Sequence, residues 1–222
     1  MKLAIGAACA LAFSAAAMAD GLDTPASPGF LDLYYTKKLE IERSDSDPAI
    51  GSSTRDTGDG YGLRSLLSVG KALAFEGEYS KTKLTRDLGG GIIFDSSLES
   101  ARLGAGMADR HGSGIFLQWL TLRASDDTGH DSLPGWAVHS RLAGDWTPQF
   151  HVYTDVSYQR YKDGAFKQAG FEYSGGAVLD VGEGAGLFAD YRVSSLKTNE
   201  EPYPAKLKST DLRLGLRLKF GG

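Results

Sequence analysis

The 222-residue sequence is poor in cysteine, in basic charge and in long apolar runs. Its one cysteine, Cys9, lies near the N-terminus, which excludes a disulfide-stapled scaffold and a thiol-based active site in the rest of the chain. Beyond the N-terminus no stretch reaches the ~18 apolar residues that a membrane-spanning helix needs. Basic residues number 24 against 28 acidic ones and form no stripe, so no nucleic-acid partner is expected.

The first 19 residues have the pattern of a secretion signal. Lys2 supplies a basic start, an Ala-rich apolar run follows, and Ala17-Met18-Ala19 has the small-x-small form that signal peptidase recognises. We therefore expect residues 1–19 to be cleaved off. The exported chain would begin at Asp20, with residues 20–29 as a lead in the periplasm.

Apolar and polar residues alternate with a period of two along most of the chain. In the closing segment one face carries Leu212, Leu214, Leu216, Leu218 and Phe220, and the other carries Asp211, Arg213, Gly215, Arg217 and Lys219. Residues 30–42 alternate similarly, with one predicted face made of Leu31, Leu33, Tyr35, Leu39 and Ile41. A helix would mix these sets, so the pattern predicts β-strands.

Ten such segments are predicted, near residues 30–42, 60–69, 72–84, 97–108, 114–125, 135–146, 149–161, 166–181, 186–197 and 206–220. Tight turns alternate with longer spacers, among them loops at 43–59 and 126–134. This is the layout of an antiparallel up-and-down barrel whose chain ends both face the periplasm. We predict an all-β fold with a single transmembrane barrel over residues 30–220, or eight strands if 114–125 and one neighbour are misassigned.

Charged residues recur on one face of successive segments, at Arg64, Glu76, Glu78, Arg102, Arg123, His139, Arg141, His151, Asp155, Glu172, Asp190, Arg192, Arg213 and Arg217. A soluble barrel would carry this set outside, whereas a membrane barrel would enclose it. Aromatic residues at strand ends and segments of ~10 to 14 residues favour the membrane barrel. Enclosed, the set would form a polar network that is either structural or lines a pore.

Within this network the sequence predicts particular ion pairs. Arg64 is expected near Glu76 and Glu78, because their strands are neighbours. Arg213 is expected near Asp190 or, where the barrel closes, near Asp32.

Four stretches, residues 60–64, 73–79, 102–106 and 212–220, resemble the small outer-membrane β-barrels of Gram-negative bacteria, the opacity-protein and OmpA- and OmpX-like group. The resemblance implies a place in the outer membrane. It also implies that Leu212, Leu214, Leu216, Leu218 and Phe220 form the signal that the barrel assembly machinery recognises, although Gly221 and Gly222 follow the usually terminal aromatic. It implies little about activity.

Two segments depart from the pattern. In 114–125 both faces are apolar, which indicates a β-bulge that switches the faces, or contact with a hydrophobic plug or a lateral opening. Residues Gly89 to Phe94 form an apolar loop tip that either packs on the rim or contacts a partner or lipid.

The histidines are the candidates for chemistry. His139 and His151 are predicted to face inward on adjacent strands, near enough to approach each other, with Asp155 on the face of His151. Ser140 is on the wrong face to act together with His139, and no third metal ligand is identifiable. We therefore predict no catalytic residue, no metal and no cofactor.

The sequence thus favours a non-enzymatic outer-membrane barrel with a structural or adhesion-like role. A small passive channel is the alternative, and a lipid-acting hydrolase is a more remote one. The expected partners are outer-membrane lipid and lipopolysaccharide, the barrel assembly machinery during biogenesis, and any surface ligand at the loops.

Overall fold

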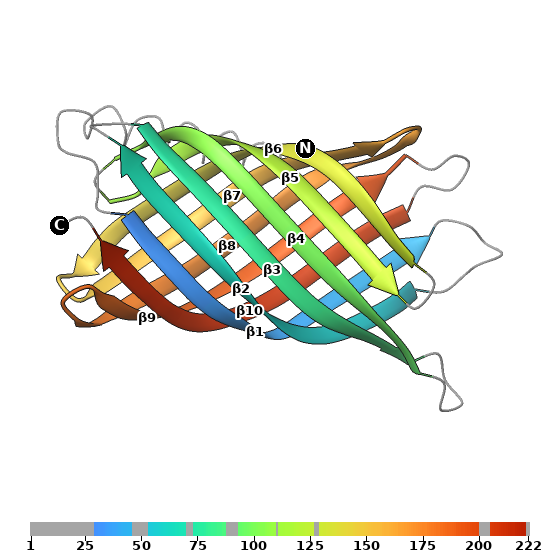
Figure 1. Cartoon of the computed structure of the whole chain (residues 1–222), viewed down its shortest axis with the longest axis horizontal. Coiled ribbons are helices and arrows are strands. Elements are labelled where there is room, and N and C mark those ends of the chain that lie inside the picture. Colours follow the sequence, from blue (N-terminus) through green and yellow to red (C-terminus); the bar gives the residue numbers. More distant parts are fainter. Residues whose placement is uncertain are drawn as a thin grey trace.

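The computed structural model describes residues 29–45, 53–69, 73–87, 93–109, 111–126, 129–199 and 205–220. These residues form ten strands: β1 (Gly29–Asp45), β2 (Ser53–Val69), β3 (Leu73–Asp87), β4 (Ile93–Ala108), β5 (Gly114–Asp126), β6 (Gly129–Thr147), β7 (Phe150–Asp163), β8 (Phe166–Gly182), β9 (Ala185–Thr198) and β10 (Ala205–Phe220). Each strand pairs antiparallel with the next in the chain, and β1 pairs with β10, so the sheet closes (Figure 1). The prediction of a ten-stranded up-and-down barrel is confirmed, and the eight-strand alternative is wrong.

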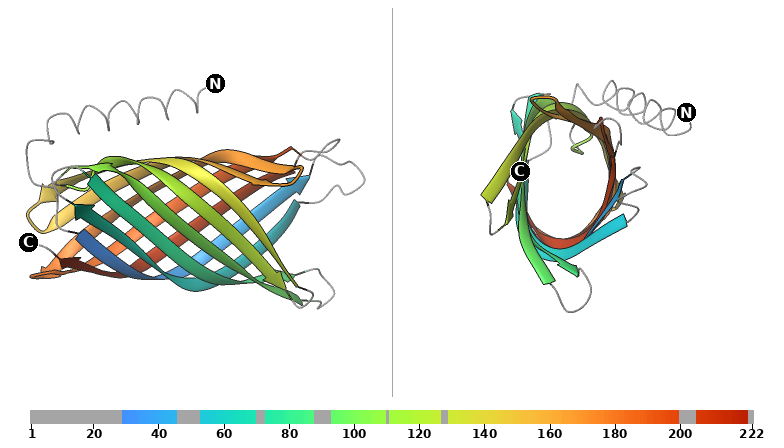
Figure 2. Two further views of the ribbon diagram at one scale, coloured as in Figure 1. Left: turned by 45° about the horizontal axis from the view of Figure 1, so that its top comes forward. Right: turned by 90° about the vertical axis from the view of Figure 1, so that its right-hand side faces the viewer.

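The barrel has two distinguishable ends. Gly29 at the start of β1 pairs with Phe220 at the end of β10, and we call this the terminal end. The opposite end, where β1 finishes and β2 starts, is the distal end. The strands are strongly tilted and wind around the axis of the barrel, as the two views of Figure 2 show. No helix in the described part of the chain is long and apolar enough to cross a membrane.

The predicted loops at 43–59 and 126–134 are mostly strand. β1 continues to Asp45 and β2 already begins at Ser53, while β5 and β6 remain paired up to Asp126 and Gly129. The ladder continues because each hairpin satisfies its backbone groups by cross-strand pairing, whatever the side chains. Both faces of the strands are polar at the distal end, so the sequence there shows no apolar–polar alternation from which these extensions could be predicted.

A β-bulge in β1 changes which residues face inward. The register with both neighbouring strands shifts between Thr36 and Leu39. Before the bulge Leu33 and Tyr35 point outward, 45% and 49% exposed, but after it Leu39 is only 7% exposed. The prediction that Leu39 and Ile41 share a face with Leu33 was therefore wrong, because the extra residue inverts the alternation.

β5 has no bulge, although both its faces are apolar. It pairs with β4 and β6 without a register shift. Phe116 and Leu120 are buried, whereas Leu117 and Trp119 are exposed on the outside. Arg123 has the parity of Leu117 and is exposed, so its predicted place inside the barrel was wrong. The strand is apolar inside because it crosses two lumenal apolar clusters.

The described residues have charge inside and apolar surface outside. The exposed large apolar side chains include Leu63, Leu67, Phe75, Leu103, Leu117, Leu187, Leu214, Leu216, Leu218 and Phe220. Aromatic side chains line up across strands on the outer wall, where Trp136 contacts Tyr158 at 6.0 Å and Tyr158 contacts Phe171 at 5.2 Å between ring centroids. An apolar exterior with aromatic rows around a polar interior is the polarity of a transmembrane barrel.

Candidate functional site: the lumenal charge belt

A belt of ionisable side chains crosses the lumen. We define the charge belt as Asp32, Arg64, Glu76, Glu78, Arg102, His139, Arg141, Asp155, Glu172, Asp190, Arg192, Arg213 and Arg217. It holds six arginines, six carboxylates and one histidine, so the formal charges nearly cancel. The alternation predicted that these side chains face inward, and the structure places each of them in the lumen.

Asp190 accepts four hydrogen bonds from other side chains of the barrel interior. It accepts hydrogen bonds from Arg213 Nε at 2.6 Å and Nη2 at 2.9 Å, from Arg64 Nη1 at 3.2 Å and from the Tyr153 hydroxyl at 2.8 Å. Arg213 lies opposite Asp190 in the β9–β10 register, is 1% exposed, and also donates to Glu78 at 2.7 Å. The predicted approach of Arg213 to Asp190 is present.

Asp32 lies at the closure of the barrel between two arginines. The register places it opposite Arg217 on β10 and opposite Arg64 on β2. Arg64 donates to it at 2.7 Å through Nη2, and Arg217 donates at 2.7 Å through Nε. Arg64 lies opposite Glu78 in the β2–β3 register, as predicted, but it donates to Asp32, Asp190 and the Tyr153 hydroxyl instead of to Glu76 or Glu78.

Other contacts span the lumen rather than neighbouring strands. Arg102 on β4 donates twice to Glu172 on β8, at 2.5 and 2.7 Å. Arg192 on β9 donates to Glu78 on β3 at 2.8 Å. These pairs tie opposite walls together, and sequence spacing could not predict them because they depend on barrel diameter and strand tilt.

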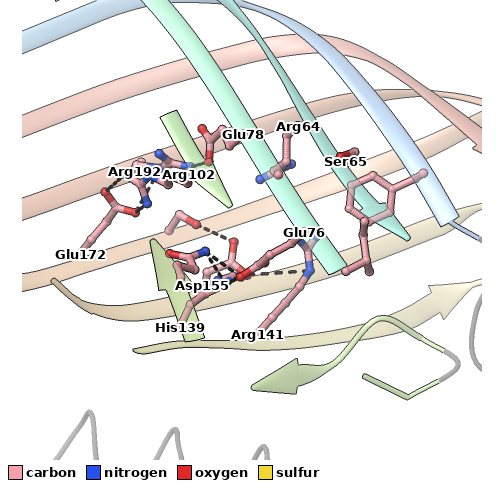
Figure 3. A pocket seen from close by; sticks show the side chains of 15 residues that line it. Arg64, Ser65, Glu76, Glu78, Arg102, His139, Arg141, Asp155, Glu172 and Arg192 are labelled. Atoms are coloured by element: carbon pink, nitrogen blue, oxygen red, sulfur yellow. Dashed lines mark hydrogen bonds and ion pairs between the residues drawn. The ribbon is translucent and has the colours of Figure 1, made fainter. Parts of the chain in front are cut away.

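His139 lies inside the belt between two carboxylates (Figure 3). Its Nδ1 is 3.0 Å from Glu76, and its Nε2 is 3.5 Å from Asp155. Gln118 Nε2 also donates to Glu76, at 2.7 Å. The Asp155 carboxylate accepts a hydrogen bond from Ser174 at 2.8 Å.

His151 does not meet His139. It lies at the terminal end, opposite Asp145 in the β6–β7 register and six positions along β6 from the level of His139. Its ring nitrogens are 2.6 Å from Asp145 and 2.8 Å from Asp180, and Lys219 Nζ donates to Asp180 at 2.5 Å. The predicted approach of the two histidines was therefore wrong. No group of three or more potential metal ligands occurs among the described residues.

Three cavities follow the lumen from one end to the other. At the level of the belt only about 30 Å³ is open. On the distal side a cavity of about 100 Å³ reaches the belt at Arg102 and Glu172. On the terminal side a cavity of about 270 Å³, which we call the terminal cavity, reaches the belt at Arg141 and Arg217. The belt therefore separates two spaces that open toward opposite ends.

Apolar clusters flank the belt along the lumen. On the terminal side Phe30, Leu66 and Phe116 pack together with Ala74 and Ala108. On the distal side Leu120, Tyr161 and Leu196 pack with Ala137. These layers reduce the access of water to the ion pairs, which strengthens the attraction between the paired charges.

The fold and the polarity define this chain as a closed β-barrel of the transmembrane type. No protein-family model and no curated protein matches it. Among solved structures it is similar to the outer membrane protease OmpT from Escherichia coli, with a TM-score of 0.50 at 7% identity over 90% of this chain and 100% of that one. At this identity the likeness concerns the fold alone.

Two further solved structures share the barrel at lower scores. The translocator domain of the autotransporter NalP from Neisseria meningitidis gives a TM-score of 0.45 at 12% identity, over 98% of both chains. Ail, the attachment invasion locus protein of Yersinia pestis, gives 0.35 at 9% identity, over 86% of this chain and 99% of that one.

Proposed function

We propose that the protein is a closed, non-enzymatic barrel of the Gram-negative outer membrane with a structural or surface-interaction role. The observation that carries this proposal is the charge belt, which leaves about 30 Å³ open at its level. A water molecule needs roughly 10 to 15 Å³ of such space, so about two water molecules fit there. A neutral, mutually bonded belt of this kind closes a lumen instead of conducting ions.

The outer surface supports the location. Its apolar wall and aromatic rows fit a bilayer, and the signal-like N-terminus fits export followed by insertion with the barrel assembly machinery. The closing strand, with Leu212, Leu214, Leu216, Leu218 and Phe220 outward, is the proposed assembly signal. The terminal end then faces the periplasm. The polar distal extensions face lipopolysaccharide and any surface ligand.

Histidine chemistry lacks support from the geometry. His139 faces Glu76 and Asp155 inside the belt, away from the lipid-facing wall on which a lipid-acting hydrolase would work. Its side chain is 11% exposed.

Single-channel recording tests the proposal. The refolded protein in a planar bilayer should show no stepwise current. The double variant Arg102→Ala/Glu172→Ala, which removes a pair of cross-lumen hydrogen bonds, should show small steps. Arg123→Ala is the control, because Arg123 lies on the outer wall and should leave the bilayer silent.

A passive channel is the second candidate, because two cavities approach the belt from opposite ends. If the unmodified protein shows regular current steps equal to those of the double variant, the closed-barrel proposal is wrong and the protein is a passive channel. In that case the belt residues would line its narrowest part.

A further inference from the structure

Arg141 differs from the other arginines of the charge belt. Arg64, Arg102, Arg192, Arg213 and Arg217 each donate at least one hydrogen bond of 2.8 Å or less to a carboxylate. The closest carboxylate oxygen to Arg141 is Asp155 Oδ1, at 3.8 Å from Nε. The Arg141 side chain is 5% exposed, and its buried Nε has no hydrogen-bond partner.

Aromatic rings hold the Arg141 guanidinium by its faces. Its central carbon lies 4.2 Å from the centroid of the Tyr153 ring and 5.4 Å from that of Phe30. Such cation–π contacts use the faces of the guanidinium and leave the N–H donors at its edge uncommitted. A buried cation with unused donors is costly unless an anion completes it.

The uncommitted edge adjoins the terminal cavity. Arg141 lines this space of about 270 Å³ together with Arg217 and Lys219, whose charges are already paired with Asp32 and Asp180. Among the described arginines and lysines that line this cavity, Arg141 is therefore the one that donates no hydrogen bond to a carboxylate. By contrast, the apolar part of the wall comes from Phe30, Leu66 and Ala143.

Charged residues at the entrance of the terminal cavity determine which anions can enter it. Asp145 lies there with His111 and His151, whose Nδ1 atoms are 3.3 Å and 2.6 Å from its carboxylate. Asp145, with Asp180 behind His151 and Lys219, disfavours the entry of a polyanion, whereas a monoanion can pass and reach the arginines at the inner end of the cavity.

We propose that the terminal cavity binds a small monocarboxylate with an apolar body. The carboxylate accepts two hydrogen bonds from the planar edge of Arg141, the geometry that guanidinium offers to carboxylates. The apolar body packs against Phe30 and Leu66. This site goes beyond the proposed structural role and does not depend on whether the barrel conducts.

The test uses the refolded full barrel in lipid nanodiscs and four probes: hexanoate, acetate, hexanamide and inorganic phosphate. The first readout is the ¹H–¹⁵N resonance of Arg141 Nε, assigned by its loss in Arg141→Gln. Hexanoate should shift this resonance saturably and bind at least tenfold more tightly than each of the other probes. Acetate tests the charge alone, hexanamide the apolar body alone, and phosphate an oxyanion without an apolar body.

Calorimetry on variants provides the second readout. Arg141→Gln should lose hexanoate binding at least tenfold, and Arg141→Lys should retain part of it. Arg123→Gln is the matched control, because Arg123 lies on the outer wall and does not line the terminal cavity, and it should bind hexanoate as the unmodified protein does.

Three results overturn the proposal: an unshifted Arg141 resonance, equal hexanoate binding by Arg141→Gln, or equal affinity for acetate and hexanoate. The resonance titration uses the unmodified protein, so it decides the matter even where a variant does not refold. Conductance is measured separately, so a failure of this site and a failure of the closed-barrel proposal are distinguishable.

Discussion

Replacing Asp190 by alanine should lower the free energy of unfolding by about 3 to 5 kcal/mol, the usual cost of breaking a buried ion pair. The carboxylate accepts four hydrogen bonds, two of them from Arg213, one from Arg64 and one from Tyr153. Arg213 retains Glu78, and Arg64 retains Asp32. The lower half of the range is therefore expected, because neither guanidinium is left without an anion.

Equilibrium urea unfolding in lipid vesicles, followed by tryptophan fluorescence, measures this loss. Asp95→Ala is the control, because Asp95 lies at the distal end, where its hydrogen bond to Thr85 is exposed; it should change stability by less than about 0.5 kcal/mol. The double variant Asp190→Ala/Arg213→Ala should lose less than the sum of the two single variants, since the pair is removed together. An Asp190→Ala barrel as stable as Asp95→Ala would refute the view that the belt stabilises the fold.

Two further predictions concern the wall and the orientation. Leu214→Arg places a cation on the lipid face and should destabilise the inserted barrel by about 2 to 4 kcal/mol in the same vesicle assay. The control is Lys83→Arg, which faces outward at the distal end and should fold normally. Equal stability of the two variants would contradict the bilayer position of Leu214. On intact cells a membrane-impermeant maleimide should label Lys83→Cys. The same reagent should label Glu183→Cys, in the exposed β8–β9 turn at the terminal end, only after the cells are lysed. The opposite result would invert the proposed orientation.

Alternation predicted the strands because lipid and lumen impose opposite demands on successive residues of every strand. Alternation predicted the wrong face where a β-bulge adds a residue to a strand, or where the lumenal side chains are themselves apolar. The bulge after Thr36 inverted the faces of Leu39 and Ile41. In β5 the inner residues Phe116 and Leu120 belong to the apolar layers above and below the belt, so both faces read alike.

The partners within the belt were less predictable than its members. Arg213 and Asp190 lie on consecutive strands in direct register, so their approach could be inferred. Arg102 reaches Glu172 across the lumen, which requires the diameter and the tilt of the closed barrel. Arg141 donates no hydrogen bond to a carboxylate because the carboxylates of the belt are bonded to other residues. This depends on the positions of all the belt residues together.

The seam between β1 and β10 has a consequence for assembly. The lipid-facing leucines of β10 repeat every two residues, so a slip of two positions would leave Leu33 opposite another leucine, Leu214 or Leu218, instead of Leu216. The inner face does not repeat in this way. The same slip would place Gly215 opposite Asp32 when the movement takes Arg217 away from it, and Asp32 would then keep only the hydrogen bonds from Arg64. The leucines favour insertion of β10 into the bilayer in more than one register. The arginines on its inner face favour the native register.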